Sequence, residues 1–391
     1  MFNFNKMNLL RKILSAVTLL LVVAFLALYF SGNIHLLKAI KSTYLVGKTG
    51  PTIDDYPKFV NRTVEAKKRQ PFVNYSKSTE IKLTTEEEKL FEKWETSSFV
   101  ILKEGKVLFE KYWDGYTDKS LTNSFSMSKS FTSLCIGAAI KEGKIESTDQ
   151  LVSDFLPEHK GSGIRIKHLL QMSSGIDFGE SYGNPFGFMA KAYYGTNIYN
   201  LTLSKISAKP SGVEWRYQGG NTLLLSFIIQ KATGKSLSNY FAEKFWQPLG
   251  AENNALWTID KEGGRERAYC CFYSNAKDYA RVGQLLLDSG KWNKKPLIEL
   301  EYFLASVSPV NLPDEFGKKV SHYGYQWWLG EYNNASFHYA RGILGQYIVA
   351  VPKWNLVFVR LGKKRDPTRN ATVPSDLLEY FEIVERLKNV S

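Results

Sequence analysis

The sequence predicts an α+β protein in which an antiparallel β-sheet flanked by helices is joined to a mostly helical lobe and preceded by one N-terminal transmembrane helix. Three observations support this fold class: an uncharged apolar run near the N-terminus, strand-like segments near both ends of the remaining chain, and helix-like segments between them. The 391 residues are 44% hydrophobic and 23% charged. This composition is typical of globular proteins and excludes a wholly disordered, collagen-like or multi-pass membrane chain.

The first predicted element is an apolar helix at residues 13–30. These 18 residues contain no charged side chain, and as a helix they would be ~27 Å long, close to the ~30 Å of a bilayer's hydrocarbon core. Lys6, Arg11 and Lys12 precede the run, so the positive-inside rule places residues 1–12 in the cytoplasm. Lysines that follow the run oppose this orientation. A cleaved signal peptide is the alternative, but the run is long for one and lacks a small-x-small cleavage site. We therefore expect a single-pass, uncleaved anchor in the cytoplasmic (inner) membrane, with the body on the periplasmic side.

Residues 31–85 predict a stalk and lead-in, because glycines and prolines punctuate them. The globular body, residues 86–391, begins with an amphipathic helix near Thr84–Glu88. A β-hairpin follows, with strands at residues 98–102 and 107–112 around a short glycine-containing turn.

The middle of the body, about residues 145–300, predicts the helical lobe. Its main helical segments are residues 221–233 and 275–288, and another helical segment, residues 127–142, precedes the lobe. A glycine follows the end of each of these segments. Strand patterns return near the C-terminus at residues 325–329, 337–341, 346–351 and 356–360, before a last helix at 375–387. The simplest closure pairs the early hairpin with these late strands in one antiparallel sheet. Ligand sites favour the interface between two such lobes.

Charge and cysteine content limit the possible partners. The formal net charge is +13, but residues 1–50 contain basic residues and no Asp or Glu, so the body is only mildly basic. We expect no nucleic-acid partner. Cys135 and the adjacent Cys270 and Cys271 make no disulfide framework, and we expect the adjacent pair to pack without bridging. The histidines lack metal-ligand spacing, so we expect no metal and no cofactor.

The informative motif is Ser126-x-x-Lys129 at the start of a predicted helix. Residues i and i+3 share one helix face, so the hydroxyl and the amine become neighbours. The free N–H groups of a first helical turn favour developing negative charge. A serine hydroxyl needs a base to become a nucleophile, and a lysine kept neutral by burial can supply it. Alone, the motif also fits an ordinary serine-capped helix.

Further motifs follow in order along the chain: His168–Gly175, Tyr217-Gln-Gly and Gly342-Ile-Leu-Gly-Gln. Together with Ser126-x-x-Lys129 they resemble the serine β-lactamase and penicillin-binding-protein superfamily, in its class C-like branch. The segments at residues 124–133, 274–283 and 323–328 are most similar to the 6-aminohexanoate-oligomer (nylon oligomer) hydrolases. The resemblance covers about residues 90–385.

This resemblance implies a β-lactamase/transpeptidase-like fold and a serine hydrolase that cleaves amides or esters by two-step acyl transfer. Ser126 would be the nucleophile, Lys129 its base, and Tyr217 the group that moves a proton to the leaving group. The backbone N–H groups of Ser126 and Ile343 would form the oxyanion hole. The candidate substrate-binding residues are Tyr182, Asn221, Gly342 and Trp327.

Two departures from the family pattern bear on the substrate. Tyr217-Gln218-Gly219 replaces the family's Tyr-x-Asn, with Asn221 two residues too late. Ala340-Arg341-Gly342 replaces Lys-Thr-Gly, and strand alternation would point Arg341 to the opposite face. We therefore expect a small-molecule or peptide-like linear amide or ester as the substrate. The alternatives are a β-lactamase or D,D-peptidase, and a catalytically idle envelope-binding protein.

Overall fold

The computed structural model describes residues 2–76, 78–367 and 372–390, and its centre is a six-stranded antiparallel sheet. The strand order is β3-β2-β12-β11-β10-β9. The strands are β2 (Thr96–Lys103), β3 (Lys106–Tyr112), β9 (Trp328–Tyr332), β10 (Ala335–Gly342), β11 (Gln346–Val351) and β12 (Leu356–Gly362). The predicted closure is confirmed, because β12 pairs directly with β2 of the early hairpin, Phe358 opposite Ile101.

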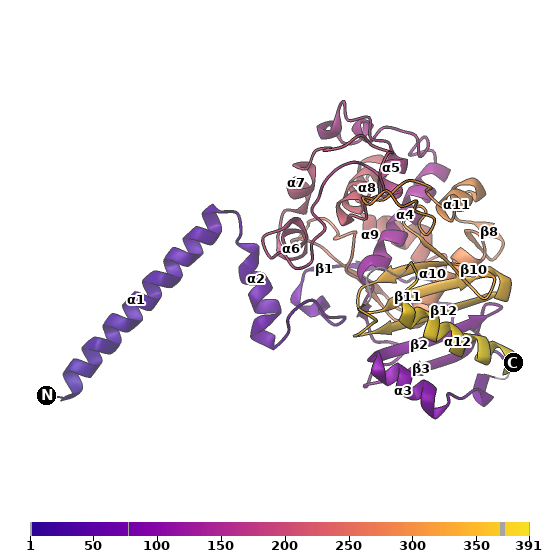
Figure 1. Ribbon diagram of the computed structural model, residues 1–391, viewed down its shortest axis with the longest axis horizontal. Helices are drawn as coiled ribbons and strands as arrows, with labels where there is room; N and C mark the ends of the chain where they lie inside the picture. Colours follow the sequence, from indigo (N-terminus) through magenta and orange to yellow (C-terminus); the bar gives the residue numbers. More distant parts are fainter. Residues whose placement is uncertain (1, 77, 368–371, 391) are drawn as a thin grey trace.

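Helices cover both faces of this sheet, which explains why strands β2, β12 and β11 are buried at nearly every position. Along β2, Phe99 and Ile101 enter the core beneath helices α3 (Thr85–Lys93) and α12 (Ser375–Val390). The alternate residues, Val100 and Leu102, belong to the core on the other face. Helix α10 (Ala276–Leu287) packs on that face. Although it lies within residues 145–300, it is therefore part of the layer on the sheet and not of the helical lobe. Figure 1 shows α12 lying along the sheet.

The helical lobe surrounds α4 (Ser128–Lys141), which is buried from Ser128 to Ala139. Helix α8 (Gly219–Thr233) packs against it. The other helices of the body are α5 (Ile166–Leu170), α6 (Phe188–Tyr194), α7 (Ile198–Leu203), α9 (Leu237–Phe241) and α11 (Leu300–Ser306). The lobe stands above the sheet in Figure 1, and α4 connects the two.

A second, four-stranded antiparallel sheet was not predicted from the sequence. Its order is β1-β5-β6-β4, with strands β1 (Asn61–Val64), β4 (Thr122–Asn123), β5 (Ala255–Thr258) and β6 (Phe272–Ser274). A small hairpin adds β7 (Lys291–Trp292) and β8 (Lys295–Pro296). The short strand β4 matters most for the site, because the chain passes from it directly to Ser126.

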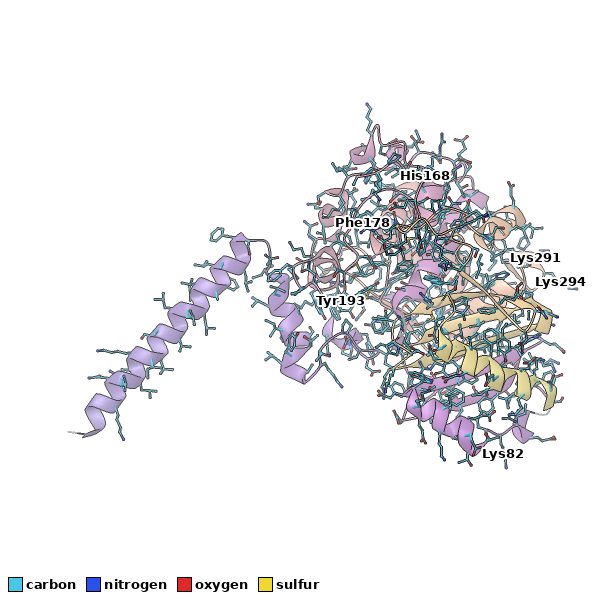
Figure 2. All side chains as sticks on the ribbon, viewed as in Figure 1. Lys82, His168, Phe178, Tyr193, Lys291 and Lys294 are labelled. Atoms are coloured by element: carbon cyan, nitrogen blue, oxygen red, sulfur yellow. A yellow bond between two sulfur atoms is a disulfide. The ribbon has the colours of Figure 1, made fainter. Side chains whose placement is uncertain are left out.

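Helix α1 (Phe2–Phe30) extends away from the body, and its side chains project without packing on it (Figures 1 and 2). The most apolar 18-residue window within Lys6–Phe30 has a mean hydropathy of 2.7, so this helix is long and apolar enough to cross a membrane. After a link of four residues, Ser31 to Ile34, helix α2 (His35–Ser42) packs beside α6.

The segment 31–85, expected as stalk and lead-in, therefore packs on the body at several points. Besides α2, its strand β1 pairs with β5, and Asn74 bridges to Val107. One late strand also differs from its expected position: β9 begins at Trp328, three residues after the predicted start.

Candidate active site

Ser126 lies in a one-turn 3₁₀ segment, Phe125–Met127, between β4 and the start of α4. It is half-buried, whereas its neighbours from Thr122 to Ala139 are all buried. Phe125 has a φ of 45°, a left-handed conformation that is unusual for a bulky residue. The reversal of the chain at Phe125 brings Ser126 to the surface of an otherwise closed segment.

A buried asparagine fixes this turn. The side-chain oxygen of Asn123 accepts hydrogen bonds from the Phe125 N–H at 2.9 Å and the Cys271 N–H at 3.1 Å. Its amide nitrogen donates to the Tyr273 hydroxyl at 3.0 Å. The side chain of Asn123 thus joins β4 to the neighbouring strand β6 at the point where the nucleophile segment begins.

The other serines of the motif are not available as nucleophiles. Ser124, Ser128 and Ser130 are buried, and each donates its hydroxyl to a backbone carbonyl, at 3.1, 2.9 and 2.6 Å respectively. Within residues 124–130, Ser126 is therefore the one hydroxyl open to a substrate.

Lys129 lies directly beneath Ser126. Its Nζ is 2.9 Å from the Ser126 Oγ and donates a second hydrogen bond to the Tyr269 carbonyl, also at 2.9 Å. Only 1% of the residue is exposed. Within the described ranges no carboxylate oxygen lies close enough to this nitrogen, 4.0 Å or less, to form an ion pair. The Lys129 Nζ thus forms hydrogen bonds with the serine and one backbone carbonyl and is not paired with an acid.

Tyr217 lies at the entry of α8 and contacts Lys129. The Lys129 Nζ stands 5.0 Å from the centre of the Tyr217 ring, within cation–π range. The ring also packs against Tyr323 at 6.0 Å and Trp328 at 5.5 Å between centroids. The structure therefore brings together three residues, Ser126, Lys129 and Tyr217, that span 91 positions along the chain.

The end of β10 forms the opposite wall. A Cβ atom on Gly342 would lie 2.3 Å from the Ser124 carbonyl oxygen, so only glycine permits this approach to the nucleophile segment. The turn that follows contains Ile343, and it continues through Leu344 and Gly345, both with positive φ. Gln346 holds the turn, because its amide nitrogen donates to the Ile343 carbonyl at 3.2 Å.

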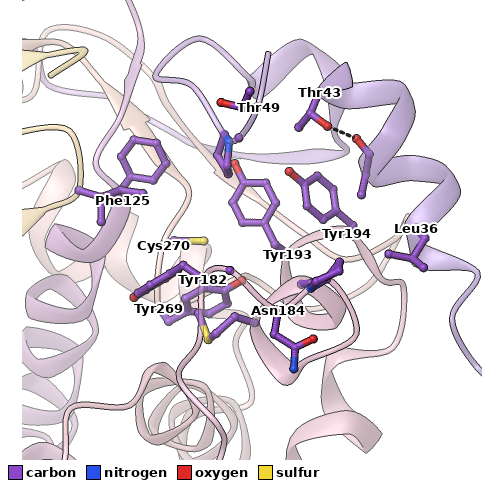
Figure 3. A pocket seen from close by; sticks show the side chains of 18 of the residues that line it. Leu36, Thr43, Thr49, Phe125, Tyr182, Asn184, Tyr193, Tyr194, Tyr269 and Cys270 are labelled. Carbon is purple, nitrogen blue, oxygen red and sulfur yellow. Dashed lines mark hydrogen bonds between the residues drawn. The ribbon is translucent and has the colours of Figure 1, made fainter. Parts of the chain in front are cut away.

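Two cavities meet at Ser126. The first, of about 480 Å³, runs from Ser126 towards α2 and is lined mainly by apolar and aromatic side chains; we call it the apolar cavity (Figure 3). The second, of about 810 Å³, contains Tyr217, Trp328 and several cationic side chains; we call it the basic cavity. Its cationic members are Lys318, Lys319, Arg341 and Arg365. Ser126, Tyr182 and Ile343 line both cavities.

The candidate substrate-binding residues divide into two groups. Tyr182 and Gly342 line the cavities at Ser126, and the Tyr182 hydroxyl donates to Glu180 at 2.7 Å. Glu180 in turn accepts from the N–H of Gly219 at 2.7 Å, which secures the Tyr182 loop to the start of α8. Asn221 and Trp327 are each only 1% exposed and do not line either cavity. The neighbouring Trp328 lines the basic cavity instead.

Arg341 reaches the site although its strand position suggested otherwise. It does lie on the face opposite Gly342, but its guanidinium stacks on the Trp328 ring at 3.8 Å and lines the basic cavity. What strand alternation did not predict is this reach: a long side chain at a strand end can bend around an aromatic neighbour. His322 lines the same cavity, where burial and then Arg341 and Lys318 lower its pKa.

The adjacent cysteines also differ from expectation. Cys270 and Cys271 form a disulfide, with an S–S distance of 2.04 Å. Both are buried, and Cys270 lines the apolar cavity (Figure 3). Cys135 is free and lies in the core, where burial raises its pKa. The rarity of bridges between neighbouring cysteines was the only sequence signal, and here it misled.

Comparison with known proteins agrees with this arrangement. The beta-lactamase family model matches residues 89–379. The chain is 28% identical over 296 residues to the 6-aminohexanoate-dimer hydrolase of Paenarthrobacter ureafaciens, which covers 70% of this chain and 74% of that protein. A solved structure from Bacillus anthracis, to which 6-aminohexanoate-dimer hydrolase activity has been attributed, has a TM-score of 0.71 at 21% identity and covers 90% of this chain and 94% of its own.

A family VIII carboxylesterase has the same fold, with a TM-score of 0.63 at 17% identity over 81% of this chain and 99% of its own. At such low identity the solved structures establish the fold alone, whereas the family model spans most of the chain. This chain therefore belongs to the beta-lactamase family, and it is a serine hydrolase.

Proposed function

We propose that the protein is a membrane-anchored hydrolase that cleaves a linear amide or ester through an acyl-enzyme on Ser126. The observation that carries this proposal is the 2.9 Å contact between the Lys129 Nζ and the Oγ of the half-exposed Ser126, at the meeting point of two cavities. The likeness to 6-aminohexanoate-dimer hydrolase supports a linear amide, and the likeness in fold to a carboxylesterase is consistent with an ester.

In the proposed mechanism, the Ser126 Oγ attacks the carbonyl carbon while its proton passes to Lys129. The N–H groups of Ser126 and Ile343 stabilise the oxyanion, and removal of one such donor costs ~10²–10³ in rate. Tyr217 delivers a proton to the leaving amine or alcohol, which departs, and Tyr217 regains a proton from the neighbouring Lys129. Water then attacks the acyl-enzyme, and one of its protons passes through the same groups to the Ser126 Oγ as the acid is released. The apolar helix α1 supports anchoring of the catalytic body at a membrane.

Labelling with a fluorophosphonate probe followed by peptide mass spectrometry tests the nucleophile. We expect the label on Ser126 in the full-length protein and no label in Ser126→Ala. Labelling of a different serine in the wild-type protein would refute the mechanism. An idle binding protein would show neither labelling nor turnover.

A second candidate function is hydrolysis of β-lactams or D,D-peptides, and the position of Arg341 favours it. The missing family lysine argued against such carboxylate-bearing substrates, but Arg341 supplies a cation to the same basic cavity. Turnover of nitrocefin, p-nitrophenyl esters and 6-aminohexanoate dimer separates the candidates. Rapid nitrocefin hydrolysis without ester or linear-amide turnover would favour the second.

A further inference from the structure

The segment that connects α1 to the body forms the far wall of the apolar cavity. Leu36, Ala39 and Thr43 line this cavity. They recur at spacings of three and four residues, so they share one face of α2 and its end. Ser126 and Ile343 line the same cavity from the body. One continuous space thus extends from the proposed nucleophile to the helix next to the membrane-spanning candidate.

Helix α2 is fixed to the body by specific contacts. The His35 Nε2 donates to the Pro185 carbonyl at 2.8 Å, and the Ser42 carbonyl accepts from the Lys58 ammonium at 2.8 Å. His35 and Ser42, at the two ends of α2, are buried. The wall is therefore a docked element of the site, as its position beside α6 in Figure 1 also shows.

The interior of the cavity suits a hydrocarbon. Between α2 and Ser126 its walls are the rings of Tyr182, Tyr193 and Tyr194 with the side chain of Met189 and the buried Cys270 (Figure 3). In the described part of the chain, no Lys, Arg, Asp or Glu lines this cavity. The basic cavity on the other side of Ser126 is, by contrast, lined by four cationic side chains and one acidic side chain, that of Asp314.

The outer face of α2 is apolar as well. Leu37 and Ile40 are 42% and 43% exposed, and the next turn exposes Tyr44, Leu45 and Val46. Lysines alternate with these residues, a pattern typical of helices that lie at a membrane surface. The cavity wall would therefore stand at the bilayer interface if α1 spans the membrane.

We propose that the substrate is a long-chain acyl ester or amide taken from the membrane, whose hydrocarbon chain occupies the apolar cavity between Ser126 and α2. This inference rests on the proposed function and names its substrate class. The chain's carbonyl carbon is attacked by Ser126, the leaving alcohol or amine departs with a proton into the basic cavity, and water releases the fatty acid.

The test compares p-nitrophenyl esters of increasing chain length on the full-length protein in lipid nanodiscs. Burial of each methylene raises kcat/KM by about fourfold until the cavity is filled. Leu36→Trp fills the cavity from α2, whereas Leu37→Trp places the same ring on the outer face. We expect Leu36→Trp to lower octanoyl-ester turnover by at least about tenfold while acetyl-ester turnover stays within about twofold. Leu37→Trp should preserve the wild-type chain-length profile.

Ala39→Trp provides a second filling variant if Leu36→Trp does not fold, and acetyl-ester turnover with circular dichroism verifies the fold of each. Equal effects of Leu36→Trp and Leu37→Trp on both esters would overturn the inference. A wild-type rate that is independent of chain length would overturn it too.

A binding measurement separates this inference from the proposed function. Dansyl-labelled undecanoic acid is titrated against Ser126→Ala, alone and combined with Leu36→Trp or Leu37→Trp. If Leu36→Trp abolishes binding of the probe and Leu37→Trp does not, the result supports the apolar cavity as a site for a hydrocarbon chain. This conclusion holds even if the wild-type protein hydrolyses no ester, in which case the proposed function fails and the inference stands. Labelling of Ser126 without any discrimination by chain length or by the two variants means that the inference alone fails.

Discussion

Phe125 and Asn123 show how single residues prepare the nucleophile. A non-glycine residue in the left-handed region costs of order 1–3 kcal/mol, and Phe125 adopts it one position before Ser126. The hydrogen bond from its N–H to the Asn123 side chain holds this conformation in place. The position of the Ser126 hydroxyl thus depends on a buried amide that never touches the substrate.

Asn123→Ala should therefore lower both stability and activity. It removes the acceptor of two buried N–H groups, those of Phe125 and Cys271, and each unsatisfied group costs ~1–3 kcal/mol. We expect a lower melting temperature and a reduced kcat, measured by thermal denaturation and ester turnover. The exposed Asn239→Ala serves as the control. Unchanged stability in Asn123→Ala would contradict the role given to this side chain.

Tyr217→Phe tests proton transfer at the same scale. The variant keeps the ring that packs on Trp328 and covers Lys129, but it lacks the phenol. We expect kcat to fall by ~10²–10⁴ with an unchanged melting temperature. Tyr332→Phe, at the opposite end of β9 from Trp328 and outside both cavities, should keep wild-type kinetics. Turnover in Tyr217→Phe that matches the wild type would remove Tyr217 from the mechanism.

At the scale of elements, α10 approaches the sheet because of one glycine. A Cβ on Gly283 would lie 2.5 Å from the Val357 Cγ1 and 2.9 Å from the Ile348 Cγ2. These atoms belong to the central strands β12 and β11, which leave little room for movement. Glycine is a poor helix former, so its presence in the middle of α10 reflects packing rather than helix propensity.

Gly283→Ala should destabilise the protein despite its better helix propensity. The gain in propensity is ~1 kcal/mol, whereas overpacking a core typically costs ~1–3 kcal/mol. We expect a net decrease in the free energy of unfolding, measured by urea denaturation. At Gly183 an added Cβ meets nothing within 4 Å, so Gly183→Ala should not destabilise. A more stable Gly283→Ala would show that the sheet yields to the methyl group.

The long elements were predictable from sequence, and the short ones were not. The hairpin, the last three strands and helices α4, α8 and α10 have strong local patterns and appear within a few residues of their predicted bounds. Strands β1, β4, β5 and β6 have two to four residues and pair across long separations, such as Asn61 with Thr258. Such pairings are stabilised by contacts that no local pattern records.

The same distinction applies to the site. Ser126 and Lys129 are one helical turn apart, so their contact follows from spacing. The reach of Arg341 around Trp328 and the disulfide at Cys270 depend on tertiary packing. The contribution of α2 to the cavity wall was missed for the same reason, because its docking uses partners such as Pro185 that lie far along the chain.

At the scale of the whole molecule, the N-terminal segment has two parts with different roles. Helix α1 is exposed along its span, whereas α2 is docked on the body. Removal of residues 2–32 should release the protein from the membrane fraction and leave butyryl-ester turnover within about twofold, since no core contact is lost. Removal of residues 2–47 should lower the melting temperature, because the contacts of His35 and Ser42 are lost.

Fractionation, thermal denaturation and ester assays of the two shortened proteins check this prediction. Equal melting temperatures for the two would contradict the docking of α2. A protein that lacks residues 2–32 yet stays in the membrane fraction would show that another surface holds it there.

The short link between α1 and α2 has a consequence for kinetics. Only Ser31 to Ile34 separate a membrane-spanning candidate from a helix fixed to the body, so an anchored enzyme would not swing freely on a tether. The orientation of the body relative to the bilayer would be restricted, and the opening of the apolar cavity would stay at a constant distance from the lipid surface. Encounter with a lipid-dissolved reactant then becomes a two-dimensional search, and the rate would follow the number of reactant molecules per unit area of bilayer.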